Sequence, residues 1–127
     1  MKFLILVPTL NSYKLLPKLV DSLKKQIFKE WRVIFVDGNS KKKHISYIKN
    51  ICYEDSRFKY ITQSRNSSGI YGAMNVGFKN VSTNEWLLFL GSDDWLASDD
   101  VLFKINKLNK KPRDYHFLLG NAIYVEN

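Results

Sequence analysis

The chain has 127 residues, of which 45% are hydrophobic and 25% charged, and these proportions are ordinary for a single globular domain. They disfavour an intrinsically disordered chain, and no apolar run approaches the ~20 residues that a membrane-spanning helix needs. A net charge of +8 favours an anionic partner, such as a nucleotide, a nucleic acid or an acidic membrane surface.

Cysteine and histidine are scarce. Cys52 is the only cysteine, so the chain can form no internal disulfide, which favours a reducing compartment. Its position near Ile48 and Ile51 predicts a small core residue rather than a nucleophile. His44 and His116 have no evident partners in the sequence, and we interpret both as surface or strand-end residues without a catalytic role.

Hydrophobic patterns predict strands and helices in alternation. Apolar runs of strand length alternate with stripes of helical period. In chain order we expect a strand at 3–7, a helix whose apolar face runs from Leu15 to Ile27, a strand at 31–36, a helix at 45–52, a strand at 58–61, a helix with Ile70, Met74 and Phe78 on one face, a strand at 86–90, a helix at 102–108 and a last strand at 117–119.

This alternation predicts an α/β fold with a mostly parallel sheet, because strands joined by helices in turn wind in one direction. Ligands of such sheets bind beyond the carboxyl ends of the strands. Polar residues gather after the first, second and fourth strands, at 8–11, 37–40 and 91–94. The sequence therefore predicts a site at this edge of the sheet.

The acidic pair Asp93 and Asp94 directly follows a strand. Adjacent carboxylates repel each other, and a bound Mg²⁺ or Mn²⁺ would offset that cost and clamp a diphosphate. The alternative is an ordinary pair of turn and helix-capping aspartates. Asp37 is open to two interpretations as well, as a ribose or base contact or as the start of a turn.

The helix beginning near Gly69 also has two interpretations. Ser67 and Ser68 precede it, and a serine cap at a helix start can bind a phosphate or serve only as a cap. No G-x-G-x-x-G and no P-loop motif occurs, which disfavours dinucleotide and P-loop nucleotide binding.

Taken together, the motifs resemble those of the family 2 glycosyltransferases, which are inverting enzymes of the GT-A fold. The resemblance rests on the segments V-P-T-L-N at 7–11, V-D-G-N-S at 36–40, G-I-Y-G-A-M-N-V-G at 69–77 and F-L-G-S-D-D at 89–94. It implies a three-layer α/β/α domain over residues 1–127 that binds a nucleotide-diphosphate sugar. The intact enzyme would transfer that sugar to a hydroxyl acceptor.

The resemblance also implies residue roles. The donor-binding residues would be Pro8, Thr9, Asn11, Asp37, Gly69, Asn75, Ser92 and Asp93. Asp94 would coordinate Mg²⁺ or Mn²⁺ between the two phosphates. The family often has an aspartate where Gly72 stands and acidic residues where 41–43 and 65–68 are basic or polar.

Family members are commonly about twice as long as a lone domain of this size, and their general base follows the metal motif. We identify no such base here, and we expect the acceptor-binding half to be missing. The alternative function is therefore a non-catalytic nucleotide-sugar-binding module or a truncated fragment.

The resemblance favours cell-surface polysaccharide synthesis in the cytoplasm, at the inner face of the membrane. The expected partners are the sugar donor, a glycan or lipid-linked acceptor, a membrane surface bound peripherally and a second copy through exposed apolar residues. A basic nucleic-acid binder is the third and least favoured candidate, because the sequence has no obvious ribbon of interleaved basic and aromatic residues.

Overall fold

The computed structural model describes residues 2–108 and 119–126. Its elements confirm the predicted alternation and add a short 3-10 helix. They are β1 (Lys2–Thr9), α1 (Leu16–Lys24), β2 (Trp31–Asp37), α2 (Lys42–Glu54), β3 (Phe58–Thr62), η1 (Arg65–Ser67), α3 (Gly69–Asn80), β4 (Glu85–Phe89) and α4 (Val101–Leu108). Of the expected last strand, 117 and 118 lie outside the described residues, and Leu119 belongs to no strand.

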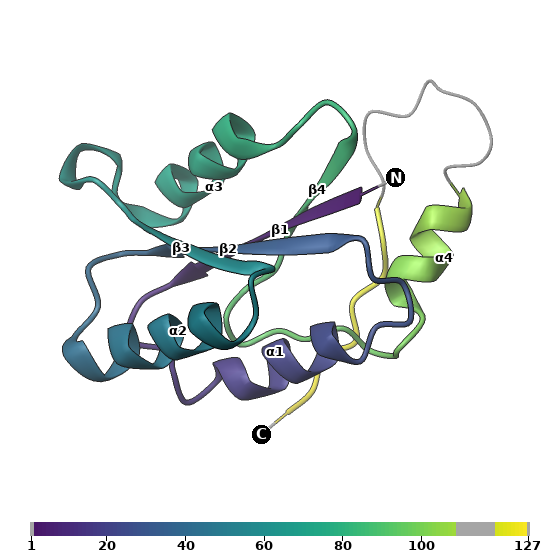
Figure 1. Cartoon of the computed structure of the whole chain (residues 1–127), viewed down its shortest axis with the longest axis horizontal. Coiled ribbons are helices and arrows are strands. Elements are labelled where there is room, and N and C mark those ends of the chain that lie inside the picture. The colour runs from purple at the N-terminus through teal and green to yellow at the C-terminus, as the bar shows by residue number, and fades with distance from the viewer. Residues whose placement is uncertain (1, 109–118, 127) are drawn as a thin grey trace.

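The four strands form a parallel sheet in the order β3-β2-β1-β4. α1 and α2 cover one face of the sheet and α3 covers the other (Figure 1). The central strands are buried on both faces, which explains why β1 and β2 read as continuous apolar runs. The predicted α/β/α layering is thus confirmed, and the carboxyl ends of all strands share one edge.

α1 is shorter than its apolar stripe predicts. The helix begins at Leu16 and ends at Lys24, and Leu15 and Ile27 lie outside it with 50% and 58% of their surfaces exposed. The expected helical face was therefore wrong at both of its ends. The buried Gln26 fixes the segment that follows the carboxyl end of α1. Its amide donates to the Ser98 carbonyl at 2.6 Å and accepts from the Leu102 backbone N–H at 3.1 Å.

α3 packs through a different face from the predicted one. Ile70 and Phe78 are each 62% exposed, whereas the small residues Gly72, Ala73 and Gly77 are buried against the sheet. A helix of small residues approaches a sheet closely. The larger apolar side chains satisfied the helical period but point outward.

The segment after β4 crosses back along α1. Leu96 donates its backbone N–H to Ser22 Oγ at 3.1 Å, and Ile27 donates to the Asp99 carbonyl at 2.9 Å. Since α1 runs opposite to the strands, its end lies at the amino edge of the sheet. Asp99 and α4 therefore lie at the amino edge, away from the carboxyl ends of the strands (Figure 1).

None of the helices in the described ranges combines the length and the apolar character that a membrane span requires.

Candidate functional site

The loops after β1 and β2 are joined at the carboxyl edge. Each contains an asparagine in the left-handed region, Asn11 at φ 50° and Asn39 at φ 66°, a conformation that asparagine tolerates better than most residues. The Asn11 N–H donates to Ser40 Oγ at 2.8 Å, and Asn11 Oδ1 accepts from the Lys41 N–H at 2.8 Å. The two loops therefore form one surface, as expected of neighbouring strand ends.

Beneath these loops lies the Asp37 cluster, which we define as Thr9, Asp37, Ser40 and His44. Asp37 has no exposed surface. Its Oδ1 accepts from Thr9 Oγ1 at 3.0 Å and from Ser40 Oγ at 2.6 Å, and its Oδ2 accepts from the Ser40 N–H at 2.8 Å. Three donors satisfy the buried carboxylate, so Asp37 fixes both loops relative to the sheet.

His44 is a member of this cluster that sequence reasoning missed. The ring is 1% exposed on the first turn of α2, so its interpretation as a surface or strand-end residue was wrong. Nδ1 accepts the Ser12 N–H at 3.1 Å, and Nε2 lies 3.2 Å from Asp37 Oδ1. Burial lowers the pKa of His44 below its usual value, against the opposing effect of Asp37.

Gln63 connects this cluster to the start of α3. Its N–H donates to the Asp37 carbonyl at 2.7 Å, and its side-chain amide donates to the carbonyls of Ser67 at 2.5 Å and Gly69 at 2.7 Å. The buried amide, rather than the expected serine, organises this helix start, since Ser68 makes no side-chain cap. Sequence reasoning missed Gln63 because its partners are backbone carbonyls.

A side chain at Gly72 would not fit beside Gln63. A Cβ there would overlap the Ser67 carbonyl and lie 2.7 Å from Gln63 Nε2. The glycine at this position is thus required by the local packing.

The acidic turn, which we define as residues 91–94, follows β4 beside the end of β1. The Leu90 N–H donates to the Leu6 carbonyl at 3.0 Å, which continues the β1–β4 register toward Pro8. Asp94 Oδ2 accepts the Gly91 N–H at 3.2 Å. A Cβ on Gly91 would lie 2.7 Å from Asp94 Oδ2 and 3.0 Å from Asp93 Oδ1, so both carboxylates fold back over Gly91.

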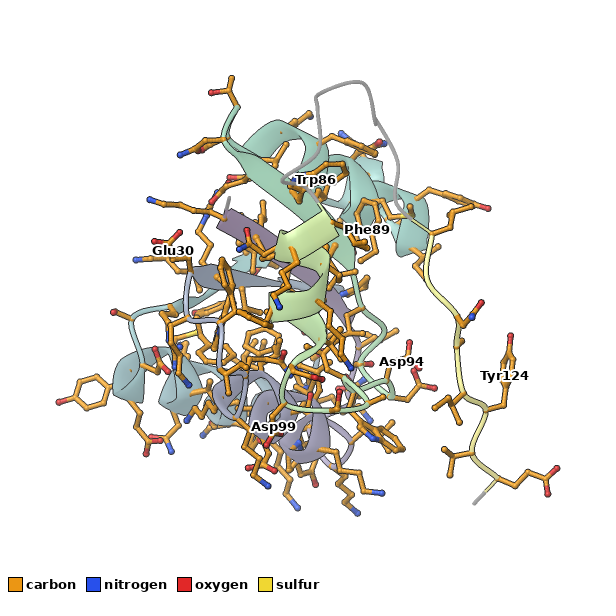
Figure 2. The ribbon with its side chains drawn as sticks, turned by 90° about the vertical axis from the view of Figure 1, so that its right-hand side faces the viewer. Glu30, Trp86, Phe89, Asp94, Asp99 and Tyr124 are labelled. Atoms are coloured by element: carbon orange, nitrogen blue, oxygen red, sulfur yellow. The ribbon has the colours of Figure 1, made fainter. Side chains whose placement is uncertain are left out.

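The acidic turn suits a hard divalent cation. Asp93 and Asp94 are exposed, and no lysine or arginine in the described part pairs with either. No group of three metal-binding side chains occurs among the described residues. Mg²⁺ usually binds one or two carboxylates together with substrate phosphates, so this donor set fits an ion that arrives with a diphosphate. In Figure 2 Asp94 lies at the rim of the compact part of the chain, on the side of the segment that carries Tyr124.

The other expected donor-binding residues lie at or near this edge. Pro8 is half-buried at the end of β1, and Gly69 begins α3 at φ 79°. Asn75 is exposed nearly two turns further along α3, and Ser92 is half-buried in the acidic turn. The structure brings Thr9, Asn11 and Asp37 into one hydrogen-bonded unit. No hydrogen bond within the described ranges connects Asn75 or the acidic turn to that unit.

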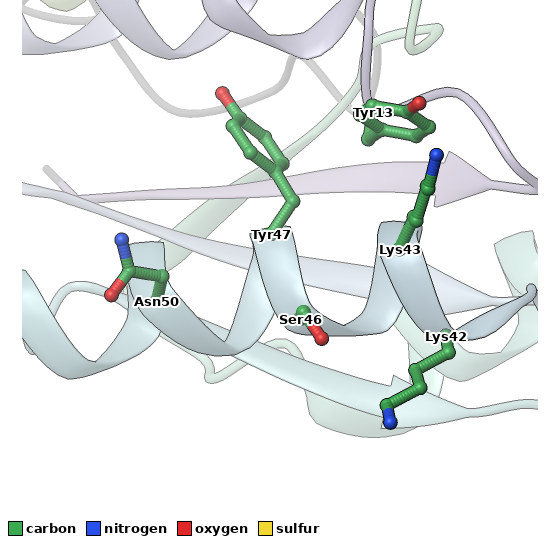
Figure 3. Close-up of a pocket in the computed structure, with 6 residues that line it drawn as sticks. All are labelled: Tyr13, Lys42, Lys43, Ser46, Tyr47 and Asn50. Atoms are coloured by element: carbon green, nitrogen blue, oxygen red, sulfur yellow. The ribbon is translucent and has the colours of Figure 1, made fainter.

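Two surface hollows do not include these residues. An open hollow of about 590 Å³ lies between Tyr13 and the outer side of α2 (Figure 3). A second, of about 350 Å³, lies at the amino edge and includes Trp31 and Arg57. The candidate site is therefore an open edge formed by loops.

Curated proteins similar to this chain are glycosyltransferases. A PGL/p-HBAD biosynthesis glycosyltransferase of Mycobacterium bovis is 36% identical over 103 residues, which cover 81% of this chain and 40% of that protein. A GalNAc(5)-diNAcBac-PP-undecaprenol beta-1,3-glucosyltransferase of Campylobacter jejuni is 32% identical over 122 residues, 96% of this chain and 38% of that protein. The chain thus spans at most about two fifths of these relatives.

Solved structures similar to this chain are also glycosyltransferases or carry a bound nucleotide sugar. The S. aureus TarS 1-349 structure in complex with UDP-GlcNAc matches with a TM-score of 0.75 and 30% identity, covering 87% of this chain and 32% of that one. A mannosyltransferase of Pyrobaculum calidifontis in complex with GDP-Man and Mn²⁺ matches with a TM-score of 0.74 at 19% identity, covering 87% and 33%, and shows the same fold. The family model for glycosyl transferase family 2 matches residues 4–120. The chain belongs to glycosyl transferase family 2.

Proposed function

We propose that this chain is the donor-binding part of a glycosyltransferase that transfers a sugar from a nucleoside-diphosphate sugar to a hydroxyl acceptor. The observation that carries the proposal is the acidic turn. It presents two carboxylates beside the end of β1 that pair with no lysine or arginine in the described ranges. The neighbouring Asp37 carboxylate is already satisfied by protein donors. Family membership makes a nucleotide sugar the natural ligand.

In this proposal the joined loops after β1 and β2 bind the nucleoside. Asn11 and Pro8 form the surface, and Asp37 acts beneath it by holding Thr9 and Ser40 in place. The α3 start at Gly69 completes the binding edge, and Asn75 contributes to it from the second turn of α3. Backbone N–H groups at a helix start favour anionic groups, so the donor phosphates would lie toward α3 and the acidic turn.

Asp94 would hold Mg²⁺ or Mn²⁺, and Asp93 and Ser92 would orient the ribose or diphosphate. A divalent cation bound there supplies charge neutralisation to the leaving nucleoside diphosphate. The Mn²⁺ in the mannosyltransferase structure supports this choice of metal. Gly91 lets both carboxylates approach the same point, because a side chain at 91 would meet them.

Isothermal titration of UDP and GDP, with and without Mn²⁺, tests the proposal. We expect Mn²⁺ to tighten binding of one nucleotide by about tenfold or more, and Asp94→Asn to abolish that gain, a difference of roughly 1.4 kcal/mol. Asp99→Asn is the matched control, since it removes the same charge from an exposed residue at the amino edge. Equal losses in both variants would contradict the proposal.

A second candidate function is a nucleotide-sugar-binding module without transferase activity. An inverting transfer needs a general base near the acceptor hydroxyl. The carboxylates next in the chain do not supply it: Asp99 lies at the amino edge, and Asp100 pairs with Lys104 at 3.0 Å. An assay for nucleotide released from UDP-GlcNAc or GDP-Man separates the two functions. A transferase releases the nucleotide, whereas a binding module binds the donor and releases no nucleotide.

For the whole protein we propose a lipid-linked or glycan acceptor at a membrane surface. The name of the C. jejuni relative includes undecaprenol, and the net charge of +8 favours anionic headgroups. Cosedimentation with vesicles containing anionic lipid, compared with neutral vesicles, tests the membrane part. Binding to neither kind of vesicle would contradict it.

A further inference from the structure

We propose that His44 is a positioning residue for the donor site, which in its neutral form holds the loop after β1 against Asp37. The inference rests on the proposed function of the carboxyl edge and concerns a buried group to which that function assigns no role. His44 connects two segments far apart in the chain, because Ser12 lies 32 residues before it. The loop that it holds includes Asn11, whose side chain joins the loop after β2.

The contacts of the ring select one protonation state. Nδ1 accepts the Ser12 N–H at 3.1 Å, so Nδ1 carries no proton and the neutral ring carries its proton on Nε2. Nε2 lies 3.2 Å from Asp37 Oδ1 but is not aligned for a hydrogen bond. The N–H of Nε2 therefore faces the carboxylate as an electrostatic contact.

Protonation of His44 would break this arrangement. A second proton on Nδ1 would face the Ser12 N–H, and two donors cannot share a hydrogen bond. Ser12 is 9% exposed, and its Oγ has no partner among the described residues. Its carbonyl accepts from the N–H groups of Leu15 and Leu16, so the hydrogen bond that protonation removes is the one that holds the Ser12 N–H itself. We expect the segment at Asn11 and Ser12 to move, and the surface that it forms with the loop after β2 to open.

The surroundings favour the neutral ring near pH 7. His44 lies in the first turn of α2, where the helix dipole disfavours a cation, and burial also favours the uncharged form. Asp37 from β2 is the charged side chain within ion-pairing distance in the described part. The titratable residues that neighbour Ser12 and His44 along the chain are Tyr13 in the loop after β1, and Lys41, Lys43 and Tyr47 at the start of α2.

The test compares the wild-type chain with His44→Gln. Glutamine can accept from Ser12 through its carbonyl and donate toward Asp37 through its amide, but it does not titrate. NMR of the ring nitrogens should show the Nε2-protonated form at pH 8. The Ser12 amide signal should shift with the same pH midpoint as the ring, and this shift should vanish in His44→Gln. A His116→Gln variant assigns the ring signals.

Binding of UDP-GlcNAc and GDP-Man with Mg²⁺ then provides the functional readout. Both phosphates of these donors are esterified, so neither has the second ionisation near pH 6 of a free phosphate. We expect wild-type affinity to fall about two- to tenfold between pH 8 and pH 5.5, the range for one lost hydrogen bond. His44→Gln should keep the pH 8 affinity and lose the pH dependence.

The outcomes separate the two proposals. If neither donor binds at pH 8 while the Ser12 amide follows the ring, the proposed function fails and the positioning contact stands. If a donor binds with the same pH profile in wild type and His44→Gln, the positioning role is overturned. It is also overturned if the Ser12 amide does not titrate with His44. His44→Leu, which makes neither contact, should weaken donor binding at both pH values.

Discussion

The Asp37 cluster and the acidic turn lie at the same edge of one sheet but are built in opposite ways. Asp37 is fully buried, and three donors from Thr9 and Ser40 satisfy its oxygens. Asp93 and Asp94 are exposed, and the one hydrogen bond to their side chains in the described part comes from the Gly91 N–H at 3.2 Å. One carboxylate is thus committed to holding the protein together, while the other two are available to a ligand.

This contrast teaches that similar aspartates after parallel strands can divide the work of a site. A buried carboxylate with several donors stabilises loop geometry, because removing it leaves those donors unpaired. Exposed, adjacent carboxylates add little to stability, and a cation relieves their repulsion. Stability and ligand binding should therefore respond to mutation at different positions.

The largest expected effect is on stability, from Asp37→Ala. We expect it to lower the free energy of unfolding by about 2–4 kcal/mol, because Thr9 and Ser40 lose a charged acceptor in a buried site. Asp94→Ala should change it by less than about 0.5 kcal/mol, as is usual for exposed residues. Urea unfolding followed by circular dichroism measures both. Equal losses would remove the distinction between the two regions.

Gly72→Ala should have the next largest effect, a loss of about 1–3 kcal/mol from overpacking. The added methyl would overlap the Ser67 carbonyl and crowd Gln63, which joins α3 to the Asp37 cluster. Thermal unfolding with Gly120→Ala as control measures it, since a side chain at Gly120 meets nothing within 4 Å. A Gly72→Ala chain as stable as the control would show that the α3 start is not tightly packed.

Gly91→Ala should affect binding rather than stability. The methyl would displace the two carboxylates, which are the free ends of exposed side chains, so folding should change by less than about 0.5 kcal/mol. Mn²⁺-dependent nucleotide affinity should fall about tenfold. Calorimetric titration beside an unfolding curve separates the two effects. Unchanged Mn²⁺ dependence would argue against a metal held by this turn.

The smallest expected effect is the pH dependence of stability that His44 contributes. Its pKa is lowered in the folded chain, so the unfolded chain binds the proton first as the pH falls. The stability that neutral His44 contributes is fully present above pH 6.5, the usual pKa of histidine. It is lost as the pH falls through the pKa of His44 in the folded chain, by at most about 1.4 kcal/mol per pH unit. Unfolding of wild type and His44→Gln from pH 8 to 5 measures it. If the free energy of unfolding changed with pH in the same way in both chains, His44 would not contribute this pH dependence.

The first four strands and their succession along the chain could be predicted from the sequence, because strands covered on both faces are continuous apolar runs. β2 was expected at 31–36 and observed as Trp31–Asp37. The face through which α3 packs on the sheet could not be predicted. Ile70 and Phe78 matched the helical period, but the small residues Gly72, Ala73 and Gly77 are the ones buried against the sheet. Local pattern carries no information on which face is close enough to the sheet.

The site was predictable in the same uneven way. Thr9, Asn11 and Asp37 were expected together, and the structure joins them. His44 was missed because the N–H that it accepts lies 32 residues earlier, at Ser12. Gln63 was missed because its side-chain amide donates to backbone carbonyls. Polar residues that become buried by long-range contacts give no signal in the periodicity of their own helix or strand.

Paramagnetic broadening by Mn²⁺ tests the central claim most directly, because it locates the ion without relying on activity. With UDP or GDP bound, replacing Mg²⁺ by Mn²⁺ should broaden the backbone amides of residues 91–94 most strongly, and those of Thr9 and Gly69 less. Broadening centred on Asp99 and Asp100, or on the hollow beside Tyr13 and α2, would contradict the account.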